Sequence, residues 1–546
     1  MKALLAAALL FAAPYIQTFE VRVVNLDVIV TDPDGKSVQG LSKSDFEIRD
    51  EGRVQEISNF SEYVGGNAVT AVNVVPDAAP VEAPKPLPRK FIFVIDDMAL
   101  HPVVADKLGR QAIELVKTSM RPGDEGMILT PTNKNRVLLP YTSDRDSVIR
   151  GIEHQIRALA FHANTRQGME SRQFQRTVMG AELDMEAASY AKRYADLVGR
   201  RVKGFVGELQ AVVNASAEVE GKKVMVIVSN SLTSEPGKEA FRFVSAMGPK
   251  AQPNDTSTRT LFSEGQKQGM SAPWIDLRPM IAEVGRSAAA NGMTIYCLAP
   301  DNASLSTNTT GDDTTAPVMP PSFVHGIADG TIDTFNTLTT ATGGRYLRGD
   351  GVIADLFQQV SSDLRAYYSL GYHAPDGESG KPRTITVRVK GHPELTVRTR
   401  RETERKTPTK EMESRVLATL MFPNDRNELG IEATTGRVVR ERDAVVVPVQ
   451  IRVPLSRLTF LPDGDKYRGS FTVTYAASTE RGDFGAGDQR EQVLEVAAAQ
   501  LEAAKKKFFT FETNLRVPTG KLTISVGVLD PLSRLSAFQT MSVDVK

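Results

Sequence analysis

Two adjacent carboxylates, Asp96 and Asp97, are the side chains of this sequence with the clearest potential for chemistry. They follow the apolar run FIFVI, whose unbroken hydrophobicity is typical of a central parallel strand buried on both faces. Carboxylates at the carboxyl end of such a strand lie at the edge where open α/β sheets bind ligands. An Asp at this position also caps the loop or helix that follows, and we favour this structural interpretation.

Patterns that would indicate an enzyme are not found elsewhere in the sequence. The 6 histidines show neither zinc-site spacing nor a His-Glu-x-x-His arrangement, and there is no Gly-x-Ser-x-Gly elbow or phosphate-binding loop. The single cysteine, Cys297, lies in the apolar run MTIYCLA, where a buried small hydrophobe is a better interpretation than a catalytic thiol. We attribute the Arg-Gly-Asp tripeptide at 481–483 to chance. We therefore expect a protein that is not an enzyme.

The length of the chain predicts its number of domains, and its charge and cysteine content argue against several classes of protein. At ~100–200 residues per domain, 546 residues predict roughly three domains. Basic and acidic residues each total 66, so the net charge is zero and no long-range field attracts nucleic acid. One cysteine excludes an internal disulfide framework and a thiolate-rich metal cluster.

The first residues predict export. Lys2 is followed by an apolar stretch from Ala3 to Ala13, the layout of a secretory signal peptide, and we assign residues 1–19 to this signal-like segment. The stretch is too short to span a membrane, which takes about 20 residues. We expect a periplasmic or secreted protein without a transmembrane span, either released or associated with the cell envelope.

A small β domain is expected at 20–63, followed by a linker at 64–89. Val24, Leu26 and Val28 fall on one parity of a period-two strand, and hairpin turn signals follow. Residues 64–89 are rich in Ala, Val and Pro without helical periodicity, which favours an extended linker.

Strands and helices alternate from residue 90 to 404. FIFVID, KKVMVIVS and MTIYCLA are predicted to be buried strands separated by helices, which indicates a central doubly wound α/β sheet. Insertions are expected at 237–273 and at 301–330, where the second is a Ser/Thr/Pro-rich loop. We assign the later strands AYYSLGY, RTITVRVK and LTVRTR to the same domain, and attribute the TGGR turn at 342–345 to the backbone freedom of glycine.

Residues 405–546 form a second β region. Short segments of alternating character between turn signals predict an immunoglobulin-like β-sandwich. The segments are RVLATLMF, VVVPVQIRV, SFTVTY, QVLEV, FFTFETNL and KLTISVGVLD. The predicted fold is therefore multidomain α/β plus β, in which a small N-terminal β domain and a C-terminal sandwich flank the central sheet.

Five segments spread collinearly over residues 24 to 401 carry a family resemblance. They are VNLDVIVTDPDGKSVQGLSKSDFEIRDEGRVQEISNFS, KFIFVIDDMAL, MRPGDEGMILTPTNKNRVLLPYTSDRDSVIRGIE, TTATGGRYL and DLRAYYSLGYHAPDGESGKPRTITVRVKGHPELTVRTRR. Together they resemble the acidobacterial VWFA-related domain proteins, which contain a von Willebrand factor A-type (VWA) domain. The resemblance implies the VWA fold and an extracytoplasmic location, and little about the partner.

The resemblance also implies where a metal-ion-dependent adhesion site would lie. Ligand-binding VWA domains carry a D-x-S-x-S loop after the first strand, a Thr on a middle loop and an Asp after a later strand. Mg²⁺ prefers octahedral hard-oxygen ligands, and these side chains supply them. Here Asp96 keeps the first place, but Met98 and Leu100 occupy the two serine places, and neither side chain has an oxygen.

The other two places of this site are also altered. Asn230 occupies the later Asp position and offers at most a neutral amide oxygen. The middle Thr is not placed, because Thr165 and Thr177 are both candidates. We therefore expect a degenerate site without a metal or another cofactor. The ligands of a residual Mg²⁺ site, and the candidate ligand-binding residues, would be Asp96, Asp97 and Asn230.

Three functions remain. The first is a metal-independent module that binds another protein in the cell envelope or extracellular space. The second is a metal-dependent adhesin that uses a rebuilt site of Asp96, Asp97 and loop oxygens. The third is a hydrolase within 237–330, which no residue pattern favours. Titration with a divalent metal separates the first two, because only the adhesin requires Mg²⁺ or Mn²⁺.

Overall fold

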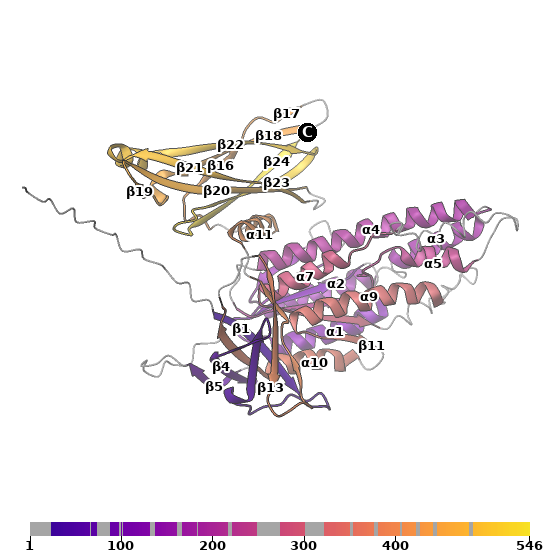
Figure 1. The fold of residues 1–546 in the computed structure, drawn as a ribbon. Helices are drawn as coiled ribbons and strands as arrows, with labels where there is room; N and C mark the ends of the chain where they lie inside the picture. The colour runs from indigo at the N-terminus through magenta and orange to yellow at the C-terminus, as the bar shows by residue number, and fades with distance from the viewer. Residues whose placement is uncertain are drawn as a thin grey trace, which may run out of the picture.

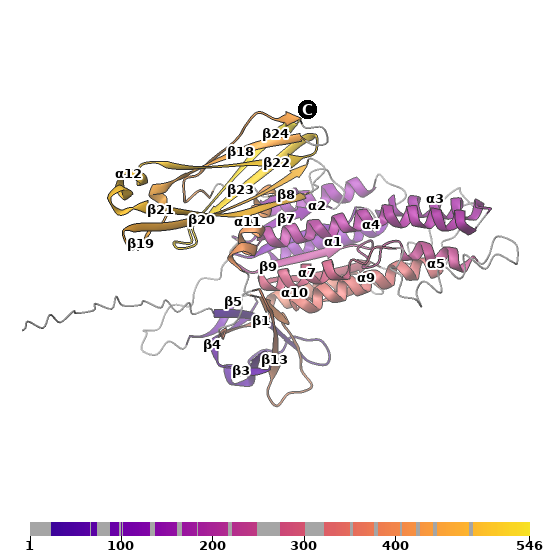
Figure 2. The ribbon, with the colours of Figure 1, turned by 45° about the horizontal axis from the view of Figure 1, so that its top comes forward.

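The structure is a computed structural model with three regions along the chain (Figures 1 and 2). Besides a central region rich in helices there are an N-terminal β region, which combines indigo strands with the orange-brown β13, and a C-terminal β region drawn mostly in yellow. The signal-like segment 1–19 lies outside the described residues, as do Met98, Thr165 and the tripeptide at 481–483. The structure describes residues 23–65, 67–73, 88–97, 100, 102–130, 137–160, 166–182, 184–216, 221–247, 274–300, 321–349, 353–375, 380–404, 407–421, 426–440, 445–479 and 484–545.

A six-stranded sheet forms the centre of the molecule, in the order β11-β10-β9-β6-β7-β8. Its strands are β6 (Lys90–Ile95), β7 (Glu125–Leu129), β8 (Val137–Thr142), β9 (Lys223–Val228), β10 (Met293–Pro300) and β11 (Tyr346–Gly349). All neighbours are parallel except β7 and β8. Counted along the chain, the order is 3-2-1-4-5-6, which is that of a doubly wound sheet whose direction of winding reverses between β6 and β9. The predicted mixed α/β architecture is confirmed.

Helices cover both faces of this sheet, because alternate strand residues point to opposite sides. Phe91 and Phe93 pack in one hydrophobic core, and Ile92 and Val94 in the other. The first core includes residues of α1 (Pro102–Ser119), α2 (Arg145–Ala160) and α10 (Ile353–Arg365). The second includes residues of α3 (Arg166–Gly180), α4 (Asp184–Ala215), α5 (Lys238–Ala246), α7 (Arg278–Ala290) and α9 (Pro321–Thr342). Cys297 of β10 is buried in the second core, as predicted, and burial raises the pKa of its thiol.

The N-terminal β region contains two sheets built from two distant parts of the chain. Their orders are β14-β1-β12-β4-β5 and β15-β13-β2-β3. The earlier strands are β1 (Val23–Thr31), β2 (Phe46–Asp50), β3 (Arg53–Gln55), β4 (Ile57–Val64) and β5 (Asn67–Asn73). The later strands are β12 (Tyr367–His373), β13 (Pro382–Val389), β14 (Thr396–Arg398) and β15 (Glu402–Glu404).

This pairing corrects the predicted boundaries of the first two domains. Residues 20–63 do not complete a β domain alone, because β12 lies between β1 and β4. The α/β region accordingly ends before β12 rather than at 404, and the predicted linker 64–89 begins with β5. Alternation shows which face of a strand is buried, but it carries no information about which strand lies beside it.

The two predicted insertions also contain helices. α5 lies within 237–273, where Phe241 and Phe243 are buried in a core, and α9 begins at Pro321, within 301–330. Residues 248–273 and 301–320 lie outside the described part of the chain.

The C-terminal region opens with a helix, α11 (Pro408–Met421), where RVLATLMF was expected to be a strand. Met412 and Val416 are one helical turn apart and are buried together, and α11 contacts α4, β20 and β23. This explains the difference, because a short apolar run suits either element and its packing decides.

Two sheets follow α11 and share one hydrophobic core. The first contains β16 (Glu432–Thr435), β17 (Val439–Arg440), β18 (Val445–Pro454) and β22 (Phe508–Val517). The second contains β19 (Leu461–Asp463), β20 (Lys466–Thr479), β21 (Phe484–Ala497), β23 (Gly520–Leu529) and β24 (Ser536–Val545). The other five predicted segments are therefore strands. Short helical turns complete the description: η1 (Lys43–Asp45), η3 (Leu455–Arg457), η4 (Ala498–Gln500) and α12 (Leu501–Lys505).

Candidate functional site

The carboxyl edge of the central sheet brings together the loops after β6 and β9. Asp96 follows β6 directly, and its backbone N–H donates to the carbonyl oxygen of Val228 at 3.0 Å, which extends the pairing of the two strands. Ser229 follows β9. Because the winding of the sheet reverses between these strands, this is the position where open α/β sheets bind ligands.

The Asp96 carboxylate is engaged inside the protein. Its Oδ2 atom accepts hydrogen bonds from the Ser229 hydroxyl at 2.6 Å and from the Ser231 hydroxyl at 2.5 Å. Asp96 is 0% exposed. The Ser229 hydroxyl oxygen in turn accepts the backbone N–H of Ser231 at 3.1 Å. The carboxylate therefore joins the end of β6 to the loop after β9, a structural role that differs from the predicted capping of the loop or helix after β6.

The three candidate residues of the sequence lie on these two joined loops. Asp97 adjoins Asp96 and is half-buried, and Asn230 is buried between the two serines. The residues that contact Asp96, however, are Ser229 and Ser231, which the sequence analysis did not single out. The sequence feature that could have identified them is a hydroxyl residue directly after a buried strand. Such a hydroxyl can donate to a carboxylate at the end of the neighbouring strand.

Thr130 is another hydroxyl residue directly after a buried strand of this sheet. It follows β7, which lies beside β6, and it is buried. Among the described residues, no hydrogen bond is made by its Oγ1 atom. Three adjacent strands thus end in oxygen-bearing side chains at this edge.

These side chains do not fit a VWA-type Mg²⁺ site. Leu100, in the place of the second serine, is 3% exposed and packs in the hydrophobic core with α1. Thr177 lies within α3 and donates its hydroxyl to the carbonyl oxygen of Gln173 at 2.9 Å. In the part of the chain that the structure describes, no three Asp, Glu, His or Cys side chains are grouped to hold a metal ion. Mg²⁺ prefers octahedral hard-oxygen ligands, and the Leu100 side chain offers none.

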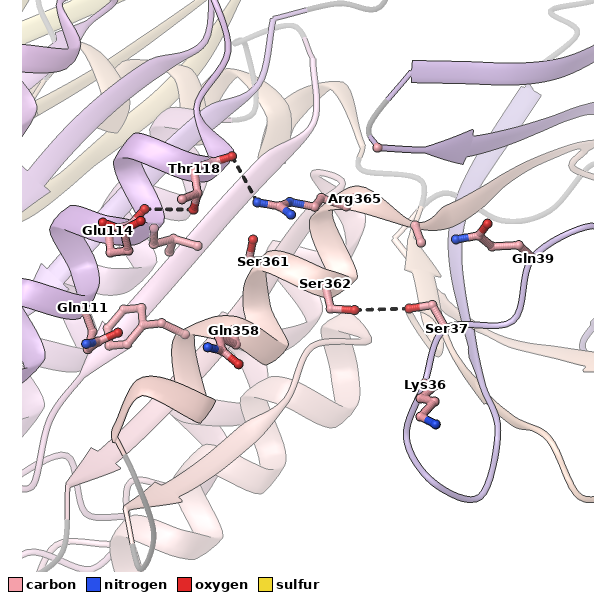
Figure 3. Close-up of a pocket in the computed structure, with 14 residues that line it drawn as sticks. Lys36, Ser37, Gln39, Gln111, Glu114, Thr118, Gln358, Ser361, Ser362 and Arg365 are labelled. Carbon is pink, nitrogen blue, oxygen red and sulfur yellow. Dashed lines mark hydrogen bonds between the residues drawn. The ribbon is translucent and has the colours of Figure 1, made fainter.

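A polar groove opens between the N-terminal β region and two helices of the central region (Figure 3). Its volume is about 730 Å³. The Ser37 and Ser362 hydroxyl oxygens are 3.3 Å apart across it, and Arg365 donates from Nη2 to the Thr118 carbonyl oxygen at 3.4 Å. Amides and hydroxyls dominate the lining, with Gln39, Gln111, Gln358 and Ser361 among its residues. Such a groove can form hydrogen bonds to a polar partner.

No helix in the described ranges is long and apolar enough to cross a membrane.

Comparison with known proteins gives distant structural similarities only. No family model matches the chain, and no curated protein matches it. The human COPII-coat protein Sec24c is similar at 10% identity over 59% of this chain and 44% of its own length, with a TM-score of 0.26. An aerotolerance-related membrane protein from Bacteroides fragilis NCTC 9343, carrying multiple mutations to serine, is similar at 11% identity. That match covers 50% of this chain and 98% of the other, with a TM-score of 0.24.

The pilus adhesin SpaC from Lactobacillus rhamnosus GG, in its open conformation, is similar at 8% identity, with a TM-score of 0.27. This match covers 94% of the present chain and 57% of the adhesin. The chain thus spans less than two thirds of Sec24c and of SpaC. These matches carry no argument for the fold. The doubly wound sheet, and the contact of Asp96 with two serines at its carboxyl edge, are established by the strand pairing and hydrogen bonds of this chain itself.

Proposed function

We propose that this chain is an exported, non-catalytic protein-binding module whose central region is a VWA-type domain that works without a metal ion. The VWA assignment rests on the family resemblance and is supported by the strand order with one antiparallel edge strand. The matching segments also include the strands on either side of the α/β region. Because those strands pair with each other, the resemblance covers one continuous body rather than separate pieces.

The observation that carries the proposal is the engagement of Asp96. A catalytic or metal-binding carboxylate needs lone pairs directed at a substrate or a cation, whereas Asp96 directs Oδ2 at the Ser229 and Ser231 hydroxyls. The hydrogen bonds link Asp96, at the end of β6, to Ser229 and Ser231 after β9. A pre-arranged loop edge on a rigid sheet binds with a small entropic cost, which favours a recognition surface.

Calorimetric titration and partner capture test the proposal together. Full-length protein titrated with Mg²⁺ and with Mn²⁺ is expected to give no saturable heat. Affinity capture from the native envelope, followed by mass spectrometry, is expected to recover the same partner protein in Mg²⁺ and in EDTA. Substitution Asp97→Lys at the loop edge should abolish that capture, while Gln358→Lys in the groove of Figure 3 should preserve it.

The competing functions predict different results. A metal-dependent adhesin requires Mn²⁺ or Mg²⁺ for capture and releases its partner in EDTA. A hydrolase would cleave the captured partner or a generic ester or peptide substrate. This activity would persist in Asp97→Lys only if the active site lay away from Asp97. Either result would reject the metal-independent binding module.

Export is tested separately by fractionation. The native protein should be recovered from the periplasm, envelope or medium. Recovery from the cytosol alone would reject the extracytoplasmic part of the proposal, without bearing on the binding surface.

A further inference from the structure

A second recess lies at the amino edge of the central sheet, at the opposite end of β6 from Asp96. Its volume is about 540 Å³, within the ~300–1,000 Å³ range of small-molecule sites. Arg89 and Lys222, which directly precede β6 and β9, line one side. Tyr63 of β4 and Tyr367 of β12 line the side formed by the N-terminal β region.

Basic side chains outnumber acidic ones in this recess. Its basic residues are Arg89, Arg121, Lys222 and Arg400, and its acidic residues are Asp27 and Asp124. Both carboxylates are already committed. Asp124 Oδ2 lies 2.6 Å from Arg89 Nη2, and Asp27 Oδ2 lies 2.9 Å from Lys222 Nζ. The lining therefore holds an excess of positive charge after its ion pairs are formed.

Neither of these two ion pairs includes the Arg121 side chain. Its backbone N–H donates to Asp124 Oδ2 at 2.8 Å, but among the described residues its guanidinium has no ion pair or hydrogen bond. Burial and the neighbouring charge of Arg89 lower the pKa of Arg121. A guanidinium stays protonated at neutral pH nevertheless, so two like charges lie close together in a partly buried place. Asp124 offsets part of this repulsion, and a bound anion beside Arg121 would offset the rest.

The two tyrosines add hydrogen-bond donors to the same recess. Their rings are stacked with centroids 4.5 Å apart, and Lys222 Nζ lies 3.5 Å from the Tyr367 centroid, which fixes the rings in place. Burial raises the pKa of both phenols, so each hydroxyl keeps its proton at neutral pH. Within the described ranges neither hydroxyl makes a hydrogen bond, and each can donate to an oxygen of a ligand.

Arg400 holds the two sides of the recess together. Its Nη1 donates to the Ala289 carbonyl oxygen at 2.8 Å at the end of α7, and its Nη2 donates to the Asn25 carbonyl oxygen at 2.7 Å in β1. The recess therefore exists before a ligand binds, which lowers the cost of binding.

We propose that this recess binds a small organic oxyanion, a carboxylate or a phosphate ester, through the Arg121 guanidinium and the hydroxyls of Tyr63 and Tyr367. A guanidinium fork matches the paired oxygens of both anions, and the phenols supply donors beside it. The dimensions of the recess favour a small molecule over an acidic protein segment.

Calorimetry on the full-length protein tests this site with phenyl phosphate and benzoate as probes, at low ionic strength and against NaCl of matched ionic strength. At least one probe should bind saturably at one site. Arg121→Ala should lower its affinity about 10- to 100-fold, because a charge-assisted pair is lost. Tyr367→Phe should lower it severalfold. Arg365→Ala, which removes a basic side chain of the groove in Figure 3, is the matched control and should leave the affinity unchanged.

The folded state of each variant is checked by circular dichroism and by the melting temperature without probe. Arg121→Ala should melt at the same or a higher temperature, because it relieves the repulsion with Arg89. Arg121→Lys, which keeps the charge and loses the fork, should bind with intermediate affinity and provides a second test if the alanine variant folds poorly. Absence of saturable binding by either probe, or equal affinity of wild type and folded Arg121 variants, would overturn the site. So would Arg121-dependent binding of polyglutamate without binding of the small probes, which would indicate a protein ligand.

Discussion

Asp96 is a carboxylate whose hydrogen bonds with Ser229 and Ser231 are structural. Its Oδ2 accepts hydrogen bonds from two serine hydroxyls, and Asp96 itself is fully buried. The same contacts support the proposed metal independence, since a cation bound at Oδ2 would have to displace them.

Asp96→Ala is expected to lower the free energy of unfolding by about 3 kcal/mol, because two hydroxyls lose a charged acceptor at a buried edge. Ser231→Ala should cost less, about 1–2 kcal/mol, since Ser229 remains paired. Urea unfolding measures both, and we expect the same values in Mg²⁺ and in EDTA. A Mg²⁺-dependent stabilisation of the wild type that is lost in Asp96→Ala would contradict the proposed function, because a ligand of the native state must stabilise it.

Glu239 is a buried acid in the first turn of α5, with 1% of its surface exposed. Burial raises its pKa from 4.5 to about 7, and the backbone N–H groups of Gly237 and Glu239 oppose the shift only in part. Because the folded pKa is the higher one, the folded state binds the proton more tightly than the unfolded state. The stability that this adds is present below about pH 4.5, is lost as the pH rises to about 7, and is constant above.

Glu239→Gln should therefore remove a pH dependence of about 3 kcal/mol between pH 4.5 and 8. The amide cannot ionise, so the variant should gain stability relative to wild type as the pH rises through this window. Unfolding by urea at pH 5 and at pH 8 gives the comparison. A difference between variant and wild type that is the same at both pH values would show that the folded carboxyl titrates normally.

The turn between α9 and β11 depends on close approach of its backbone to the central sheet. Gly343 has φ of 76°, and a Cβ on it would lie 2.5 Å from the backbone of Thr399. A Cβ on Gly344 would lie 1.8 Å from the carbonyl oxygen of Ile295 in β10. The glycines of this turn are thus required for contact with both neighbours, not only for the turn itself.

Gly344→Ala is expected to destabilise the protein by about 3 kcal/mol or more, since the clash is with a backbone atom that cannot rotate away. Gly204→Ala in α4 is the matched control. A Cβ there meets nothing within 4 Å, and alanine favours a helix by roughly 0.5–1 kcal/mol. In thermal and urea unfolding, Gly344→Ala should lower the stability and Gly204→Ala should raise it. Equal effects of the two substitutions would mean that β10 moves to accept the added methyl group.

The sheets of the N-terminal β region contain chain segments from both sides of the α/β region (Figure 1). β12 pairs with β1 on one side and with β4 on the other. Tyr368 and Tyr372 of this strand are buried, and the Tyr372 hydroxyl donates to Asp50 at 2.9 Å. Without β12, β1 and β4 would each lose one neighbour and would no longer be joined in one sheet.

A chain that ends at residue 366 should consequently lose the N-terminal sheets and keep the central one. Hydrogen exchange followed by mass spectrometry should find β1 and β4 unprotected in this truncated chain, while β6 and β9 remain protected as in the full-length protein. Full protection of β1 and β4 after truncation would restore the predicted independent domain at 20–63.

Local sequence patterns were sufficient to predict the buried strands β6, β9 and β10, the helices that alternate with them, and five strands of the C-terminal region. This succeeded because a strand such as β6, buried on both faces, must be apolar throughout, and a helix on a sheet must repeat its apolar residues every three or four positions. Pattern alone failed for α11, where Val416 and its apolar neighbours suit either element.

Only the tertiary structure decided which distant segments meet. Asp96 is bound by serines 133 and 135 residues away in sequence, and β12 fills a sheet begun by β1 at the other end of the α/β region. The recess around Arg121 likewise needs β4, β6, β9 and β12 to lie around one space. The periodicity of apolar residues along the sequence indicates which side chains must be buried. Their neighbours are chosen by the packing of the whole chain, where contacts made far apart in sequence outweigh local preference.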